Sequence, residues 1–155
     1  MKAGKYDISV DQGSTFIFHM GYCDSSGASV DLSGHTASMQ VRRSVIDSQL
    51  ILDISGGASG FGGVTGGGIT GEFLAGSLSG PSGGGSAARD ISGITLNAST
   101  SGATGTIGGV YIYIDSDTMK NVPPGNHYYD FEFDNGGVIT KVISGRFEVE
   151  GEVTR

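Results

Sequence analysis

The residues best able to do chemistry in this chain are three histidines, His19, His35 and His127. Nucleophilic catalysis needs a histidine or another base close to a hydroxyl or thiol. His19 lies on the polar side of an alternating run, whereas His35 and His127 follow turn residues, and the sequence has no G-x-S-x-G motif. We therefore expect three surface or turn histidines, no catalytic triad, and a protein that is not an enzyme.

Acidic and thiol side chains offer a second kind of chemistry, the binding of a metal ion. Asp115 and Asp117 flank one serine, and Asp24 precedes Ser25-Ser26-Gly27, but neither site has the spaced acids and closing glutamate of a calcium loop. A turn or a helix cap explains these carboxylates better. The single cysteine, Cys23, excludes an internal disulfide and a multi-cysteine zinc site, and we expect it to be buried as a small hydrophobic residue. No metal and no cofactor is predicted.

Composition disfavours sugar cleavage and nucleotide binding. The chain has no tryptophan, the commonest stacking platform for sugars, so a glycosidase is a poor interpretation. The glycine runs 66–68 and 83–85 lack the strand, helix and lysine of a phosphate loop. The formal net charge is −7 with only nine lysines and arginines, which disfavours nucleic acid as a partner.

Hydropathy predicts a protein that neither enters a secretory route nor crosses a membrane. The N-terminal residues include lysines but no apolar run of about 7–15 residues, and no segment approaches the ~20 apolar residues of a membrane span. We expect a soluble protein made in a cytoplasm, with no membrane partner.

Apolar residues recur with period two in several short runs, the pattern of strands with one buried face. Turn signals separate the runs, and Asp134-Asn135-Gly136-Gly137 is typical of a hairpin loop. Only Ser116 to Asn121 is expected to form one helical turn, ending at the prolines. The runs expected to share a face are Tyr6, Ile8 and Val10; Phe16, Phe18, Met20 and Tyr22; Ala37, Met39 and Val41; Tyr129, Phe131 and Phe133; and Ile139, Ile143, Phe147 and Val149.

These runs predict the fold class: all-β, an antiparallel, immunoglobulin-like β-sandwich with a long glycine-rich insertion. The length of 155 residues fits one domain, 1–155, in which the insertion occupies about residues 56–90.

The glycine-rich insertion carries the candidate interaction residues. Glycine loses much backbone freedom on ordering and buries no side chain, so such a segment adds little to a core of its own. We interpret it as an arm that lies along a partner subunit; the alternative is an irregular insertion without specific contacts. The apolar side chains predicted to fill a partner's pockets are Phe61, Val64, Ile69, Phe73, Leu74 and Leu78.

Several short sequence segments outside the insertion together resemble a known protein family. They are Tyr6-Asp7-Ile8 with Gln12 to Phe16, Val30 to Ala37 leading into Met39 to Arg42, Gly93 to Leu96, Pro124-Gly125 with Tyr129 to Glu132, and Gly145 to Val149 with Glu152 to Arg155. Over about residues 5–54 and 91–155 the chain resembles small virion proteins of tailed bacteriophages, and is similar to the N-terminal β-sandwich domain of phage baseplate upper proteins. The resemblance implies a structural module without catalytic residues, and the insertion departs from the family's compact pattern.

The leading functional hypothesis is therefore a bacteriophage virion structural protein. It would act as an adaptor in the tail, baseplate or neck that attaches fibres or other subunits. Its expected partners are other phage structural proteins and copies of itself, in a homo-oligomer or a multi-copy symmetric assembly. One alternative is a capsid decoration or head-to-tail completion protein. Another is a host-glycan-binding module that stacks sugars on Tyr111, Tyr113, Tyr128 or Tyr129.

Overall fold

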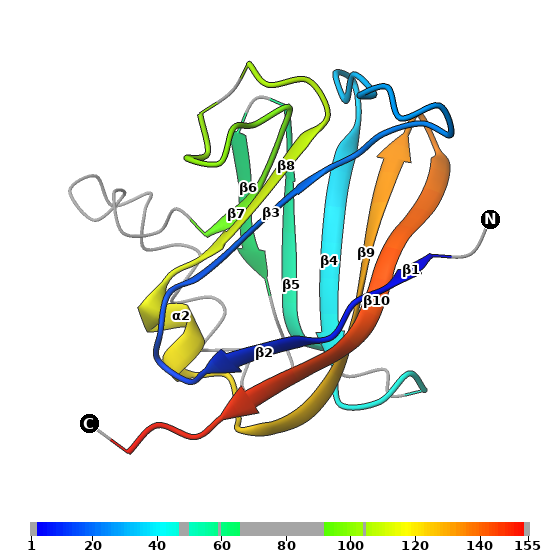
Figure 1. The fold of residues 1–155 in the computed structure, drawn as a ribbon. Coiled ribbons are helices and arrows are strands. Elements are labelled where there is room, and N and C mark those ends of the chain that lie inside the picture. The colour runs from blue at the N-terminus through cyan, green and yellow to red at the C-terminus, as the bar shows by residue number, and fades with distance from the viewer. Residues whose placement is uncertain (1–2, 47–49, 59, 66–91, 104, 154–155) are drawn as a thin grey trace.

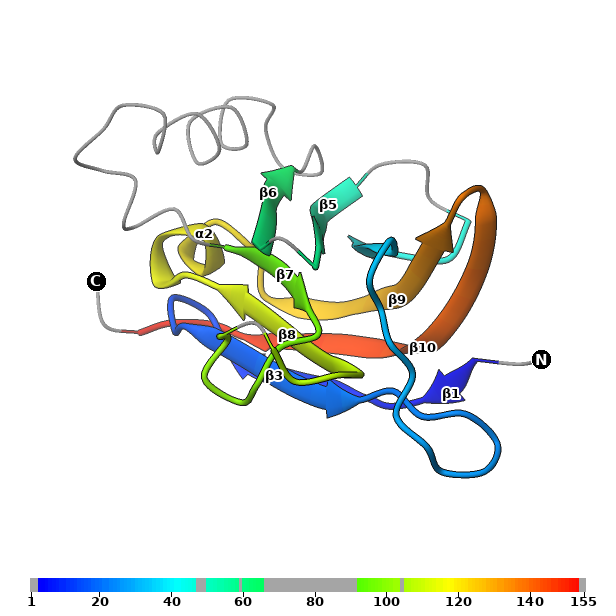
Figure 2. The same ribbon diagram turned by 90° about the horizontal axis from the view of Figure 1, so that it is seen from above.

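The computed structural model describes residues 3–46, 50–58, 60–65, 92–103 and 105–153, and in this part the chain is all-β with one short helix. One mixed sheet curls into a half-barrel (Figure 1), and the view from above shows its two ends turned towards each other (Figure 2). The predicted all-β class is confirmed. The main path of the sheet runs β1-β10-β9-β4-β5-β7-β8-β3, with β2 paired to β10 and β6 paired to β5. The elements are β1 (Gly4–Lys5), β2 (Ile8–Asp11), β3 (Phe16–Gly21), β4 (Thr36–Arg42), β5 (Leu50–Gly57), β6 (Gly60–Thr65), β7 (Gly93–Leu96), β8 (Gly109–Ile114), α2 (Ser116–Lys120), β9 (Gly125–Asn135) and β10 (Val138–Glu150).

The longest ladder is antiparallel and joins β4, β9 and β10. β9 and β10 are connected by Gly136 and Gly137, whose φ angles of 61° and 93° are easily reached only without a side chain. The backbone N–H of Gly137 donates to Asp134 Oδ1 at 2.7 Å and closes the turn. The predicted hairpin at residues 134–137 is confirmed.

Among the described strands, three pairs are parallel, which the expectation of an antiparallel fold did not include. β1 and β2 both run parallel to β10, and β5 runs parallel to β7. Parallel pairing joins segments that are far apart in sequence, so it leaves no local turn signal to predict it from. The sheet is consequently mixed.

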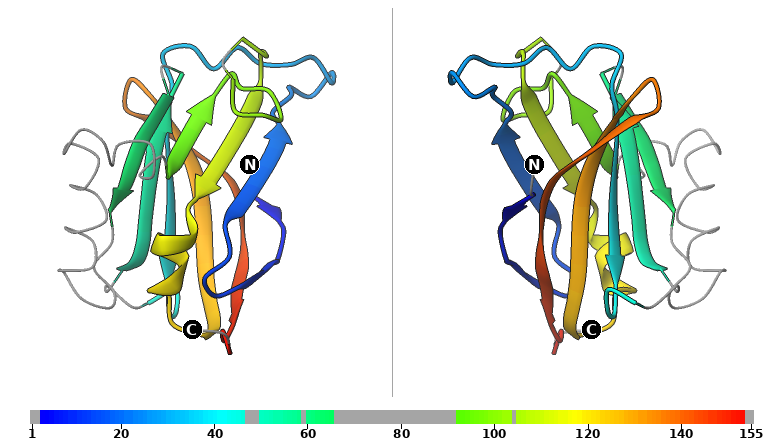
Figure 3. Two further views of the ribbon diagram at one scale, coloured as in Figure 1. Left: turned by 90° about the vertical axis from the view of Figure 1, so that its left-hand side faces the viewer. Right: turned by 90° about the vertical axis from the view of Figure 1, so that its right-hand side faces the viewer.

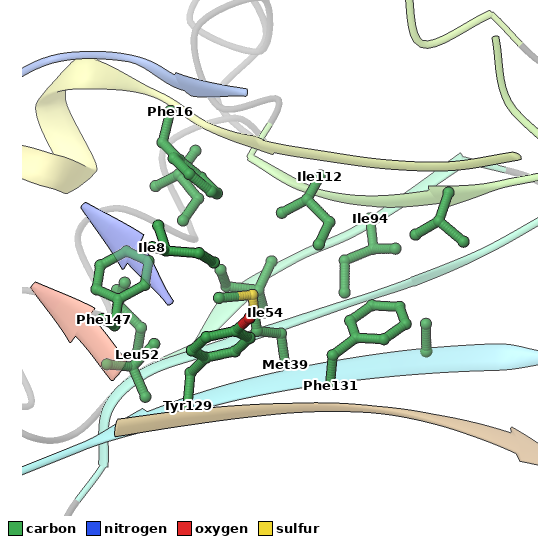
Figure 4. Close-up of a cluster of buried hydrophobic side chains, with 14 of the residues drawn as sticks. Ile8, Phe16, Met39, Leu52, Ile54, Ile94, Ile112, Tyr129, Phe131 and Phe147 are labelled. Atoms are coloured by element: carbon green, nitrogen blue, oxygen red, sulfur yellow. The ribbon is translucent and has the colours of Figure 1, made fainter. Parts of the chain in front are cut away.

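The core fills the space between the two ends of the curled sheet. Met39, Tyr129 and Phe131 approach it from β4 and β9, and Ile94 and Ile112 approach it from β7 and β8 (Figure 4). The side views show the strands of the two ends lying one in front of the other (Figure 3). Burying this set of side chains is the main stabilising contribution to the fold.

A bulge in β10 changes which side chains face the core. Lys141 pairs with Glu132, and Ile143 pairs with Phe131, so one extra residue lies between them. Ile139, before the bulge, is 54% exposed, whereas Phe147 and Val149 are buried. The expectation that all four apolar residues share one face is therefore wrong for Ile139, because the bulge exchanges the faces of the strand.

The predicted helical turn is confirmed as α2. Asp115 is its N-cap and accepts a hydrogen bond from the backbone N–H of Thr118 at 2.8 Å. This carboxylate is 8% exposed. Asp115 therefore caps a helix, the structural role that the sequence favoured over metal binding.

Candidate functional site: the outer face of the long ladder

Side chains on the solvent side of residues 4–11, β10, β9 and β4 lie in rows that cross the strands, and we call this surface the outer face. Alternate residues of β9 point to opposite sides, so burial of Tyr129 and Phe131 places Tyr128 and Asp130 on the outer face. One row consists of Lys5, Ser144, Asp130 and Gln40. The next row consists of Arg146, Tyr128 and Arg42.

The N-terminal segment extends these rows beyond β10. The backbone N–H of Tyr6 donates to Ser144 O at 3.1 Å, and the Tyr129 hydroxyl donates to Tyr6 O at 2.6 Å from the core side. A side chain at position 145 would collide with the Tyr6 carbonyl, so glycine permits this close approach. Asp7 is held beside the second row, where it accepts the backbone N–H of Arg146 at 2.9 Å.

The outer face is hollowed into a groove with two adjoining lobes of about 550 and 400 Å³. Lys5, Val45 and Tyr128 line both lobes. Tyr128 is 40% exposed and Val45 is 83% exposed, so the groove combines apolar surface with charge. Its other charged lining residues are Arg42, Asp130 and Lys141 in the larger lobe, and Asp7 and Arg146 in the smaller.

Among the described residues that line the groove, cations outnumber carboxylates, although the chain as a whole is acidic. Lys141 pairs with Asp130 at 2.5 Å, and this hydrogen bond raises the pKa of the lysine. Arg146 Nε lies 3.9 Å from Asp7 Oδ2. Lys5 Nζ donates to the neutral Ser144 Oγ at 3.0 Å. Among the described residues, Lys5 is therefore a cation of the groove without a carboxylate partner.

The same surface turns acidic further along β10. Glu148 and Glu150 are exposed there, and Asp11 of β2 pairs in register with Glu150. Within the described residues, no cation lies within ion-pairing distance of these three carboxylates. We call Asp11, Glu148 and Glu150 the acidic strip.

A second polar cluster, at the loop end of the molecule, is organised around Asn97. Its Oδ1 accepts the backbone N–H groups of Leu32 and Gly108 at 3.0 and 3.1 Å, and its Nδ2 donates to Asp31 Oδ1 at 2.8 Å. Asn97 has a φ of 52°, which asparagine tolerates better than most residues. Hydrogen bonds from the backbone N–H and the hydroxyl of Ser33 lower the pKa of Asp31. This cluster fastens loops to one another.

The three histidines lie in separate places. His19 Nε2 donates to Ala98 O at 3.0 Å, and the ring of His35 packs edge-on against Phe133 with ring centroids 5.8 Å apart. His127 is 4% exposed, so the expectation of a surface or turn residue is wrong for it. β9 begins at Gly125 and thereby brings position 127 onto the buried face of the strand. His127 Nε2 donates to Pro123 O at 2.7 Å.

Cys23 and Asp24 belong to a surface loop. Cys23 is exposed, contrary to the expectation of a buried residue, because it forms an isolated bridge with Ser29 at the base of a turn rather than part of a core strand. Asp24 Oδ1 accepts the backbone N–H groups of Ser26 and Ala28 at 2.8 and 3.1 Å. This aspartate therefore shapes a turn.

The four tyrosines proposed as sugar platforms differ in exposure. Tyr129 is 4% and Tyr111 7% exposed, and Tyr111 stacks on Tyr113 with ring centroids 6.4 Å apart. Tyr128 is the tyrosine of the four that lines the groove with its ring on the outer face. Sequence alternation could place it outside, but could not place Arg42 and Arg146 on either side of it.

The candidate arm residues fall at the edge of the described structure or beyond it. Phe61 and Val64 lie in β6, which pairs with β5 and belongs to the sheet. β6 therefore lies within the predicted insertion. The other candidates lie outside the described residues: Ile69, Phe73, Leu74 and Leu78.

Comparison with known proteins gives no assignment. No protein-family model matches the chain, and no curated protein is similar enough to count as a relative. In the described part, no three histidine, cysteine or acidic side chains gather so as to hold a metal ion. Among the helices of the same residues, none has the length and apolar character to span a membrane.

Proposed function

We propose that the chain is a structural subunit of a bacteriophage particle, an adaptor that joins copies of itself or other virion proteins in the tail, baseplate or neck. The observation that carries the binding role is the outer face, where Tyr128 stands between Arg42 and Arg146 on a continuous antiparallel ladder. Tyrosine and arginine are the residues most often found at the energetic centre of protein interfaces. The phage context is supported by the resemblance of residues 5–54 and 91–155 to small virion proteins.

The finer architecture belongs to the same proposal. The strands β3, β8 and β7 face β4, β9 and β10 across the core, as the two layers of a β-sandwich do. We propose that the curled sheet acts as such a sandwich, with one layer free to bind. A capsid decoration or head-to-tail completion protein would use the same surface and remains the alternative position in the particle.

A host-glycan-binding module is the second candidate function, and one observation favours it. Tyr128 is partly exposed in a groove that also holds Asp130 and Lys141, which can accept from and donate to sugar hydroxyls. Glycan-array binding that Tyr128→Ala abolishes would support this function. No binding to any glycan would leave the assembly role alone.

Detection in purified particles tests the leading proposal. Mass spectrometry of virions from the chain's source should find the protein in many copies per particle. Deletion of residues 66–85 then tests the predicted arm: we expect a folded protein that no longer enters particles. Absence of the chain from purified virions would contradict the structural role, and normal incorporation of the deletion variant would contradict the arm.

A further inference from the structure

The charge on the outer face changes sign along a single strand. Beyond the bulge, Ser144, Arg146, Glu148 and Glu150 alternate with residues of the opposite side and lie on the outer face. Arg146 lines the groove, and Glu148 and Glu150 belong to the acidic strip. Two residues span about 7 Å of strand, so basic and acidic surfaces meet abruptly.

The N-terminal segment carries a cation and a carboxylate at the matching ends of this surface. Lys5 pairs with Ser144 at the basic end, and Asp11 pairs with Glu150 at the acidic end. Because both pairings are parallel and keep one register, Lys5 lies on the same side of the boundary as Arg146, and Asp11 lies on the same side as Glu150. Asp7 stands beside Arg146 and is the acid of this segment on the basic side. Among the described residues, the surface therefore has one half with more cations than carboxylates and one acidic half, and the boundary lies between the rows of Arg146 and Glu148.

A two-fold axis along that boundary brings opposite charges together. If a second copy faces the first with the axis running across the strands, the row of Arg146 meets the row of Glu148 in the other copy. The row of Lys5 meets the row of Glu150 and Asp11. Arg146 and Lys5 of each copy then face carboxylates of the other, and the contact is made twice, as in an isologous dimer.

We propose that the outer face is a self-complementary interface through which two copies of the chain pair about a two-fold axis, the groove of each against the acidic strip of the other. This inference rests on the proposed assembly function and names the surface that serves it. Face-to-face packing of two sheets at a distance of about 10 Å has ample precedent in β-proteins.

The occupant is a second copy because one chain carries both halves of the complementary surface. Within the described part of the chain, Lys5 has no carboxylate partner and Asp11, Glu148 and Glu150 have no cation partner, and all four residues lie on one sheet. Pairing covers Tyr128 and Val45, the exposed apolar residues of the groove. A foreign acidic partner would account for the groove but leave the acidic strip without a role.

Charge reversal tests the pairing in solution. Sedimentation velocity of the full chain at low salt, up to about 1 mM, should show a monomer–dimer equilibrium that high salt weakens. Arg146→Glu and Glu148→Arg should each raise the dissociation constant about tenfold or more, because like charges then face each other. Lys120→Glu and Asp117→Arg make the same changes of charge on α2, at residues that belong neither to the groove lining nor to the acidic strip, and should leave the dimer intact.

Mixing the two reversed chains identifies the symmetry. Arg146→Glu and Glu148→Arg chains should form a one-to-one dimer, because the first then carries carboxylates at both positions and the second carries guanidinium groups at both. A head-to-tail arrangement would instead give species larger than a dimer. A monomeric wild type, dimers that survive either single reversal, or a mixture that yields no closed dimer would each overturn the proposal.

These outcomes are separable from a failure of the proposed function. A chain that pairs as described but is missing from virions contradicts the virion role alone. A chain found in virions whose pairing ignores Arg146 and Glu148 contradicts the interface alone. Circular dichroism melting of every variant confirms that the reversed chains are folded.

Discussion

Two polar regions of the molecule use their hydrogen bonds in opposite ways. At the loop end, the side chain of Asn97 binds the backbone of two other loops and the carboxylate of Asp31. On the outer face, the partners among the described residues are a carboxylate 3.9 Å away for Arg146 and a neutral hydroxyl for Lys5. The first region is saturated by its own chain, whereas the second retains capacity for another molecule.

This difference separates structural from binding residues better than residue type does. Both regions are rich in charged and amide side chains, and both lie at the surface. A polar group that satisfies backbone N–H groups stabilises the fold, because removing it leaves those donors without a partner. A polar group directed at solvent contributes little to stability and is free to serve recognition.

Among these substitutions, that of Asn97 should lower the free energy of unfolding most. Asn97→Ala removes the acceptor for Leu32 and Gly108 and places alanine at a φ of 52°, so we expect a loss of about 3 kcal/mol in the free energy of unfolding. Urea denaturation measures it. Asn97→Gly keeps the backbone conformation and should cost less. A loss for Asn97→Ala no larger than for Tyr128→Ala would contradict the structural role of the cluster.

Tyr128 and Tyr129 are neighbours on β9, so their substitutions compare the outer face with the core side of the same strand. Tyr129→Phe removes the hydroxyl that donates to Tyr6 O, and should lower the free energy of unfolding by about 1 kcal/mol. Tyr128→Phe alters the outer face and should change it by less than about 0.5 kcal/mol. The two urea midpoints should therefore separate clearly. Equal midpoints would show that the N-terminal segment is not held from the core side.

The sequence predicts local features of this fold and not its long-range pairings. Alternation in residues 129–133, the cap at Asp115 and the turn at Gly136-Gly137 each depend on residues within one element, and the structure confirms all three. The bulge in β10 and the parallel pairing of the N-terminal segment depend on contacts across the chain. The rows of the outer face arise from those contacts, so the candidate site was not predictable, although alternation places Tyr128 on the side of the strand opposite Tyr129.

The carboxylates of the loop end should lose their stabilising contribution as the pH falls. Hydrogen bonds lower the pKa of Asp24 and Asp31 below 3.8, so these carboxylates stabilise the fold above that pH and lose their contribution as the pH falls through their folded-state pKa. Asp31→Asn should be less stable than the wild type near pH 6, and the difference should shrink towards pH 2. Urea midpoints across this range provide the measurement. A difference that stays constant would mean that the charge of Asp31 contributes nothing.

The contribution of Asp53 to folding stability should change with pH in the opposite direction, and substituting it should have the smallest effect on the free energy of unfolding. It lies on the outer side of β5, near Gln40 and Ser38, and burial raises its pKa above 3.8. Its protonated form therefore favours the folded state, a contribution that is complete below 3.8 and is lost as the pH rises through the raised pKa. Asp53→Asn keeps a neutral, hydrogen-bonding side chain there, so its urea midpoint should exceed that of the wild type at pH 7 and approach it in acid. A lower midpoint at pH 7 would mean that attraction to nearby Arg42 outweighs the cost of burying the carboxylate.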